Sequence, residues 1–153
     1  MVKVLLVDDE FLVCSYLRQL IDWESQGYRI VGQASNGRQA VEKIRELNPD
    51  LVFLDVHMPE MDGIDLIRLL HEQHPQTKVI ILSSYSNYHY VRETMKSGAV
   101  DYLLKHELTA EGLRRILDHL GGGGGGGFFV YTPVYRCRGG GDKRRVFFVP
   151  RGP

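Results

Sequence analysis

Short apolar runs alternate along the chain with segments whose apolar side chains recur every three or four residues. The runs predict buried strands at residues 3–7, 28–34, 51–54, 78–82 and 100–104. The periodic segments predict amphipathic helices at residues 11–21, 38–47, 64–71, 88–96 and 109–120. Five such alternations are typical of an α/β fold in which a doubly wound parallel sheet carries helices on both faces.

Start and stop signals agree with these bounds. Asn36 precedes the second predicted helix as a cap, and Asn48 with Pro49 ends it. Gly98 stops the fourth predicted helix.

Polar side chains follow the predicted strands at the points where they end. Asp8 and Asp9 follow the first strand, Asp55 the third, Ser83 and Ser84 the fourth, and Lys105 the fifth. The carboxyl ends of parallel strands share one edge of the sheet, where open α/β sheets bind their ligands. We therefore predict a site at this edge that combines carboxylates, hydroxyls and an amine.

The carboxylates at this edge need a compensating charge. If the first and third strands are neighbours, Asp8 or Asp9 lies near Asp55, and two unit charges ~5 Å apart repel by about 3 kcal/mol at an effective dielectric of 20. Either one carboxyl is protonated or a cation binds, and oxygen ligands with open positions suit Mg²⁺. Lys105 adds a positive charge, and the Ser83 hydroxyl adds a hydrogen-bond donor.

Such a set of groups is suited to the transfer of a phosphoryl group to a carboxylate. Asp55 is the candidate nucleophile because it stands alone at its strand end, whereas the paired Asp8 and Asp9 are candidate metal ligands. A Mg²⁺-dependent phosphohydrolase that uses Asp55 is an alternative. It would need a second acid two residues further on, where the chain has His57.

Five ordered motifs resemble the receiver domain of bacterial two-component response regulators. They are Val-Asp-Asp-Glu at residues 7–10, Leu-Asp-Val-His-Met-Pro-Glu-Met-Asp-Gly at 54–63, Ser-Ser at 83–84, and Asp-Tyr-Leu-Leu with the following lysine at 101–105. The resemblance covers residues 1 to about 120. Trp23-Glu24, Gly27-Tyr28 and residues 85–90 are similar to receivers whose output is an AraC-type DNA-binding domain.

The resemblance implies a flavodoxin-like sheet with strand order 2-1-3-4-5 and a defined role for each strand-end residue. Asp55 would accept a phosphoryl group from a histidine kinase. Asp9 and Asp55 would bind Mg²⁺ directly, Asp8 would bind it mainly through water, and the backbone carbonyl of His57 would complete the protein ligands. The protein would then be a phosphoacceptor switch and not an enzyme, apart from its own phosphorylation and slow dephosphorylation.

The resemblance also implies how the switch works. Lys105, Ser83 and Ser84 would contact the phosphoryl group, and Tyr102 would be the aromatic residue that turns inward when Ser83 moves. The face of the fourth helix, fifth strand and fifth helix would report the state, and it could form a homodimer. One departure concerns the loop after Lys105, where many receivers have proline and this chain has His106. The geometry of that loop therefore stays open.

Charge and glycine divide the chain at about residue 120. Residues 1–120 carry 18 acidic and 13 basic side chains, a net charge of −5, whereas residues 121–153 carry a net charge of +5. Residues 121–127 are all glycine and predict a flexible linker. Residues 128–153 form a basic aromatic tail, either disordered or a hairpin, which is a nucleic-acid arm or a non-native, frameshifted or added segment.

The remaining features favour a cytoplasmic protein. Acids end the first apolar run after Val7, so we expect no signal peptide, no membrane span and no membrane partner. Cys14 and Cys137 have neither the spacing of a disulfide framework nor that of a zinc site. We expect a switch that controls transcription through an output domain absent here. The alternatives are a stand-alone phosphorelay receiver that acts by protein contact and a DNA-binding protein that acts through its tail.

Overall fold

The computed structural model describes residues 1–56, 58, 63–84, 88–121, 127–134 and 143–150. The chain divides into two compact units, Met1–Ala110 and Glu111–Pro153. The position of His57 lies outside the described residues.

A five-stranded parallel sheet forms the centre of the first unit. Its strands are β1 (Val2–Val7), β2 (Tyr28–Ala34), β3 (Leu51–Asp55), β4 (Lys78–Ser83) and β5 (Asp101–Leu104). Their order across the sheet is β2-β1-β3-β4-β5, and each neighbouring pair is parallel. The predicted flavodoxin-like order 2-1-3-4-5 is therefore confirmed.

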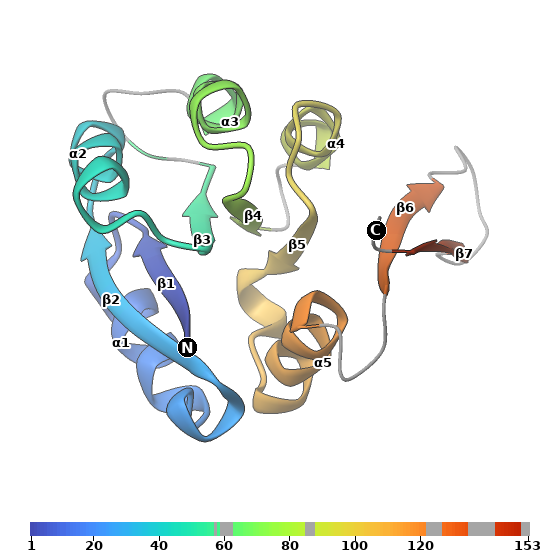
Figure 1. Cartoon of the computed structure of the whole chain (residues 1–153), viewed down its shortest axis with the longest axis horizontal. Helices are drawn as coiled ribbons and strands as arrows, with labels where there is room; N and C mark the ends of the chain where they lie inside the picture. The colour runs from blue at the N-terminus through green and yellow to red at the C-terminus, as the bar shows by residue number, and fades with distance from the viewer. Residues whose placement is uncertain (57, 59–62, 85–87, 122–126, 135–142, 151–153) are drawn as a thin grey trace. The chain divides into compact units, whose positions relative to one another are not determined.

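The helices follow the strands as the periodicity predicts. They are α1 (Phe11–Leu20), α2 (Gly37–Leu47), α3 (Gly63–Gln73), α4 (Tyr88–Lys96) and α5 (Ala110–Gly121), with short 3₁₀ turns at Glu24–Gln26 and Lys105–Glu107. Helices α2, α3 and α4 lie on one face of the sheet, and α1 lies on the other (Figure 1). Within the described residues, no helix is long and apolar enough to cross a bilayer.

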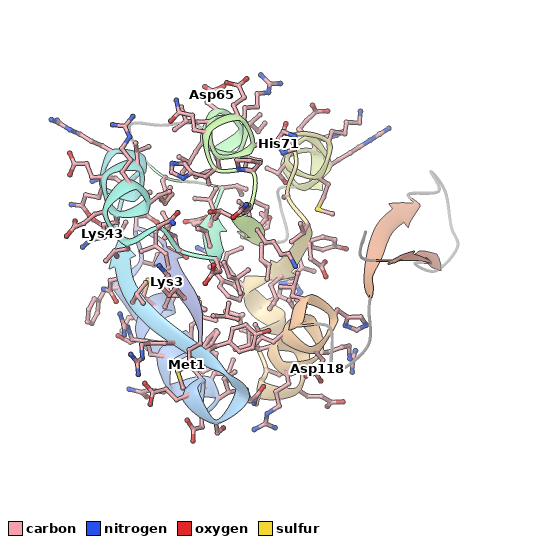
Figure 2. The ribbon with its side chains drawn as sticks, viewed as in Figure 1. Met1, Lys3, Lys43, Asp65, His71 and Asp118 are labelled. Carbon is pink, nitrogen blue, oxygen red and sulfur yellow. The ribbon has the colours of Figure 1, made fainter. Side chains whose placement is uncertain are left out.

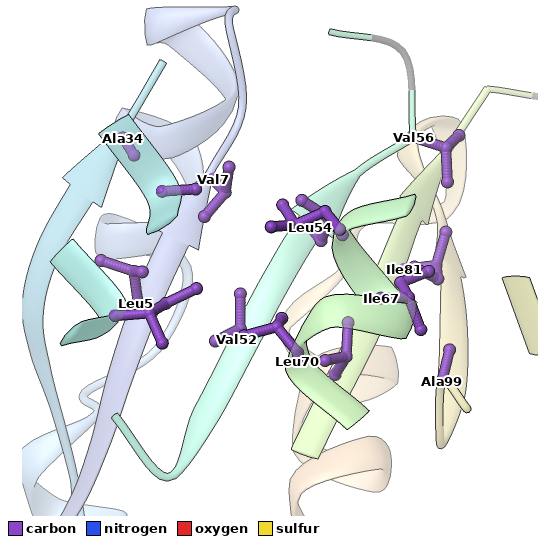
Figure 3. Packing of buried hydrophobic residues seen from close by; sticks show 14 residues of the cluster. Leu5, Val7, Ala34, Val52, Leu54, Val56, Ile67, Leu70, Ile81 and Ala99 are labelled. Atoms are coloured by element: carbon purple, nitrogen blue, oxygen red, sulfur yellow. The ribbon is translucent and has the colours of Figure 1, made fainter. Parts of the chain in front are cut away.

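Alternate strand residues build the core between the sheet and the helices α2 and α3. Figure 3 shows Leu5 and Val7 of β1, Val52 and Leu54 of β3, and Ile81 of β4 pointing to the same side. Ile44 of α2 and Ile67 and Leu70 of α3 pack into this cluster. Successive strand residues face opposite sides of a sheet, so the continuous apolar runs arise because both sides are covered.

Phe53 is a buried anchor on the opposite side of the sheet. Its ring meets the edge of Trp23 at a centroid distance of 5.8 Å, and Trp23 meets Tyr28 at 6.4 Å. The indole N–H of Trp23 donates to the carbonyl of Leu17 at 2.9 Å. The end of α1 is thereby attached to the sheet through one aromatic side chain.

Local signals set the ends of α2. The Asn36 side chain accepts a hydrogen bond from the backbone N–H of Gln39 at 2.8 Å, which caps the helix as predicted. Asn48 ends it in the left-handed conformation with φ of 48°. Lys3, labelled in Figure 2, donates from Nζ to the carbonyl of Leu47 at 2.9 Å. This contact ties the last turn of α2 to the start of β1.

The second unit contains β6 (Gly127–Val134) and β7 (Lys143–Pro150), which pair antiparallel with Gly127 opposite Pro150. This pairing corresponds to the hairpin expected for the tail. The boundary expected at about residue 120 and the origin of the tail stay predictions.

Replacing Phe53 tests the aromatic anchor. Phe53 is fully buried, so Phe53→Ala should lower the free energy of unfolding by about 3–5 kcal/mol, through lost burial and the cavity that remains. Urea unfolding followed by circular dichroism measures the change. Phe11→Ala is the matched control, because Phe11 is 68% exposed and its removal should change stability by no more than about 0.5 kcal/mol. Equal losses in the two variants would contradict the role of the anchor.

Candidate functional site

The strand register brings the predicted residues to one edge of the sheet. Val7 of β1 pairs with Leu54 of β3, Asp55 pairs with Leu82 of β4, and Ser83 pairs with Leu104 of β5. The residue that ends or follows each strand therefore falls on the same carboxyl edge. Asp8, Asp55, Ser83 and Lys105 all lie there, as the sequence predicts.

The ammonium group of Lys105 is the centre of this edge. Its Nζ lies 3.0 Å from Asp8 Oδ2, 3.1 Å from Glu10 Oε1 and 3.2 Å from Asp55 Oδ2. The side chains of Asp8 and Asp55 are only 1% and 3% exposed. Two buried carboxylates thus share one cation, which confirms that the ends of β1 and β3 are close.

Asp8 is held on one side and left incomplete on the other. Its Oδ1 accepts a hydrogen bond from the backbone N–H of Glu10 at 2.8 Å. Its Oδ2 is buried and in ionic contact with Lys105, but among the described residues it accepts no hydrogen bond of acceptable geometry. A buried carboxylate oxygen without a donor costs free energy unless a further ligand reaches it.

Burial and charge act in opposite directions on the two members of this pair. Burial raises the pKa of Asp8 above its usual value, and the Glu10 N–H and Lys105 offset this only in part. Burial alone would lower the pKa of Lys105, but its contacts with Asp8, Asp55 and Glu10 outweigh that effect and raise the pKa. Lys105 is therefore a permanent cation at neutral pH.

Three consecutive acids offer oxygen atoms to a metal. Carboxylate oxygens of Asp8, Asp9 and Glu10 lie within 4.8 Å of one another, and this is an acidic cluster of the part of the chain that the structure describes. A pocket of about 120 Å³ opens beside Asp8 and Asp9, against Gln33 and Gln39. It is smaller than the roughly 300–1,000 Å³ of organic-ligand sites. Oxygen donors next to an unsatisfied Oδ2 fit a small hard cation such as Mg²⁺.

The other predicted site residues have different surroundings. Ser83 is fully buried and its hydroxyl donates to the carbonyl of Ser84 at 3.0 Å, whereas the Ser84 side chain is exposed. Tyr102 is half-buried and packs against the core cluster. The roles expected for these residues stay predictions, as does the ligand role of the His57 carbonyl, which lies outside the described residues.

A contact from α1 holds the loop that follows Lys105. Lys105–Glu107 forms a 3₁₀ turn, and the described residues contain no cis peptide bond. The hydroxyl of Tyr16 donates to the carbonyl of Leu108 at 2.9 Å. The loop with His106 in place of proline is thus trans and attached to α1.

Glu10 is the site residue that the sequence analysis missed. It is the N-cap of α1, and an acid there is ordinary, because it favours the positive end of the helix. Its side chain makes no capping hydrogen bond and instead contacts Lys105, which lies 95 residues away in the sequence. Its position directly after Asp8 and Asp9 was the only available signal.

Known proteins share both the sequence and the fold of this chain. The response regulator receiver domain matches residues 4–118. The chemotaxis protein CheY of Thermotoga maritima is 42% identical over 103 residues, which cover 67% of this chain and 84% of CheY. The uncharacterized transcriptional regulatory protein YesN of Bacillus subtilis is 42% identical over 105 residues, which cover 69% of this chain but 28% of YesN.

A solved structure agrees with these matches. The receiver domain of AraT, a response regulator from Geobacillus stearothermophilus, superposes with a TM-score of 0.72 at 33% identity, over 76% of this chain and 91% of that domain. The chain covers about half of the transcriptional regulatory protein YdfI of Bacillus subtilis, at 53% of its length. It therefore corresponds to one part of these longer regulators.

Neutralising Asp8 tests whether the buried charge is costly. The raised pKa means that protonated Asp8 favours folding, and this stability is lost as the pH rises from its usual value of 3.8 through the raised value. Asp8→Asn should therefore raise the urea midpoint at neutral pH in metal-free buffer, because its amide oxygen can still accept the Glu10 N–H. The gain should shrink on acidification, where wild-type Asp8 becomes protonated.

Asp9→Asn is the control, because Asp9 is exposed and its neutralisation should change stability by no more than about 0.5 kcal/mol. A lower midpoint for Asp8→Asn at neutral pH would show that the ion pair with Lys105 outweighs the cost of burial.

Proposed function

Because this chain belongs to the family of response regulator receiver domains, we propose that it accepts a phosphoryl group from a histidine kinase on Asp55. One observation carries the proposal. The ammonium of Lys105 contacts buried Asp8 and Asp55 at 3.0 and 3.2 Å at the ends of adjacent strands. A carboxylate beside a resident cation can receive a phosphoryl group, since the added negative charge is met by a fixed positive one.

The transfer is balanced in bonds and charge. An Asp55 oxygen forms a bond to phosphorus, while the bond from phosphorus to the kinase histidine nitrogen breaks and that nitrogen takes up a proton. Lys105 neutralises the phosphoryl oxygens during the transfer. Hydrolysis by water breaks the new bond and returns the Asp55 carboxylate and inorganic phosphate. The protein acts as a phosphoacceptor switch.

Mg²⁺ is the cofactor that these residues would hold. Asp9 and Asp55 would be its direct protein ligands together with the His57 carbonyl, and Asp8 would bind it mainly through water. The unsatisfied Oδ2 of Asp8 and the oxygen donors beside it support this assignment. When bound, the ion neutralises negative charge on the phosphoryl oxygens.

Ser83, Ser84 and Tyr102 form the proposed response to phosphorylation. Ser83 would exchange its hydrogen bond to the Ser84 carbonyl for one to the phosphoryl group. The half-buried Tyr102, which packs against the core cluster, would then turn inward. A phosphoryl group can shift the population of the two states only through such differential contacts.

The proposed output is control of transcription in the cytoplasm. The chain covers only 28% of YesN and 53% of YdfI, both transcriptional regulators, so DNA binding would belong to a part not included here. The resemblance of residues 23–28 and 85–90 favours an AraC-type output domain. Homodimerisation through the face of α4, β5 and α5 is a further part of this proposal.

Phosphorylation by a small donor tests the proposed role of Asp55. Incubation with acetyl phosphate and Mg²⁺ should give a single phosphoryl adduct in the intact mass of wild-type protein, and Asp55→Asn should reduce it at least about tenfold because the attacking oxygen is lost. Chelation of Mg²⁺ by EDTA should also suppress the adduct.

The matched control is Asp65→Asn, since Asp65 lies exposed on α3 and outside the site (Figure 2). It should be phosphorylated like the wild type. An adduct that persists in Asp55→Asn would contradict the assignment, and sustained turnover of phosphate esters would favour the phosphohydrolase instead.

A further inference from the structure

Glu10 makes a contact that the proposed function does not use. Its carboxylate accepts a hydrogen bond from Lys105 Nζ at 3.1 Å, across 95 residues of sequence. The other described ion pairs outside the site join residues three to five positions apart, such as Arg29 with Glu24 at 3.4 Å. The contact between Glu10 and Lys105 therefore connects the loops after β1 and β5, which are separated in the sheet by β3 and β4.

Two features make this contact specific to the site. The backbone N–H of Glu10 donates to Asp8 Oδ1 at 2.8 Å, so the same residue is anchored at the buried acid and reaches the shared cation. The Lys105 side chain is only 16% exposed, whereas the Glu10 side chain is 62% exposed. Glu10 thus approaches a partly desolvated cation from the solvent side, while Asp8 and Asp55 approach it from the buried side.

We propose that Glu10 is a positioning residue that competes with the phosphoryl group for Lys105. This inference rests on the proposed phosphoacceptor function. Phosphorylation occupies Asp55, and Mg²⁺ engages the acids around it, so the buried partners of Lys105 change between the two states. The exposed Glu10 carboxylate stays available in both. It holds part of the hydrogen-bonding capacity of Lys105 and adds a negative charge near a phosphoryl group that is itself negative.

The competition predicts opposite changes for the two ligands of the site. Without the Glu10 charge, Lys105 is free to turn fully toward a phosphoryl group, so that group should bind more tightly. Mg²⁺ alone should bind more weakly, because the site loses a negative charge and Lys105 moves closer to the remaining acids. A purely structural role of Glu10 would change both affinities in the same direction.

Binding of beryllofluoride and of Mg²⁺ to the full chain tests this. Beryllofluoride, a phosphoryl mimic, is titrated at saturating Mg²⁺ and followed by fluorine NMR, and Mg²⁺ alone is titrated by calorimetry. Glu10→Gln should bind beryllofluoride about two- to fivefold more tightly and Mg²⁺ about two- to fivefold more weakly, the range expected for one solvent-facing ion pair.

Two further variants separate the contact from the charge. Glu10→Asp keeps the charge but shortens the side chain, so it should resemble Glu10→Gln toward beryllofluoride and wild type toward Mg²⁺. Glu24→Gln is the matched control, because Glu24 is 63% exposed, pairs with Arg29 and lies outside the site. It should match wild type toward both ligands.

The outcomes distinguish this inference from the function on which it rests. If wild-type protein binds no beryllofluoride, the phosphoacceptor proposal is wrong and this inference is wrong with it. If wild type binds it and Glu10→Gln has the affinities of Glu24→Gln, Glu10 does not compete for Lys105 and only this inference is wrong. A parallel loss of both affinities in Glu10→Gln would also contradict it.

Discussion

The contact of one lysine with two buried carboxylates is the interaction on which this edge of the sheet depends. Asp8 and Asp55 are almost completely removed from water, and Lys105 Nζ lies 3.0 and 3.2 Å from them. Without the ammonium group, two negative charges would lie close together at low dielectric, an arrangement that folded proteins avoid by protonation or by binding a cation. The raised pKa of Asp8 shows that even with Lys105 present the compensation is incomplete.

The rest of the first unit positions this charged edge. The five parallel strands are covered on both faces, so their ends can shift little without disturbing packed side chains such as Leu54 and Phe53. Gly63 contributes to the same edge, because a Cβ there would lie 3.1 Å from the Cα of Val56, which directly follows Asp55. Charged groups held in this way need no reorganisation when a ligand arrives, which is the benefit that offsets their cost in stability.

The family match and the geometry support different parts of the function. The receiver match over residues 4–118 identifies the kind of domain, and similar domains occur in proteins as different as CheY, YesN and CheB. A shared fold does not determine what such a domain controls. The local chemistry comes from the side chains of this chain, and Glu10 shows that a residue outside the expected set can contact the central cation.

Local pattern determined the secondary structure and the identity of the edge residues. The apolar periods predicted the five strands and five helices to within a few residues, and the Asn36 cap was recognisable because its hydrogen bond is made within α2. Tertiary structure alone decided that Asp8 is buried whereas its neighbour Asp9 is exposed, and that Glu10 meets Lys105 across 95 residues. Burial and ion pairing depend on distances between chain segments that are remote in sequence, and no local pattern encodes those distances.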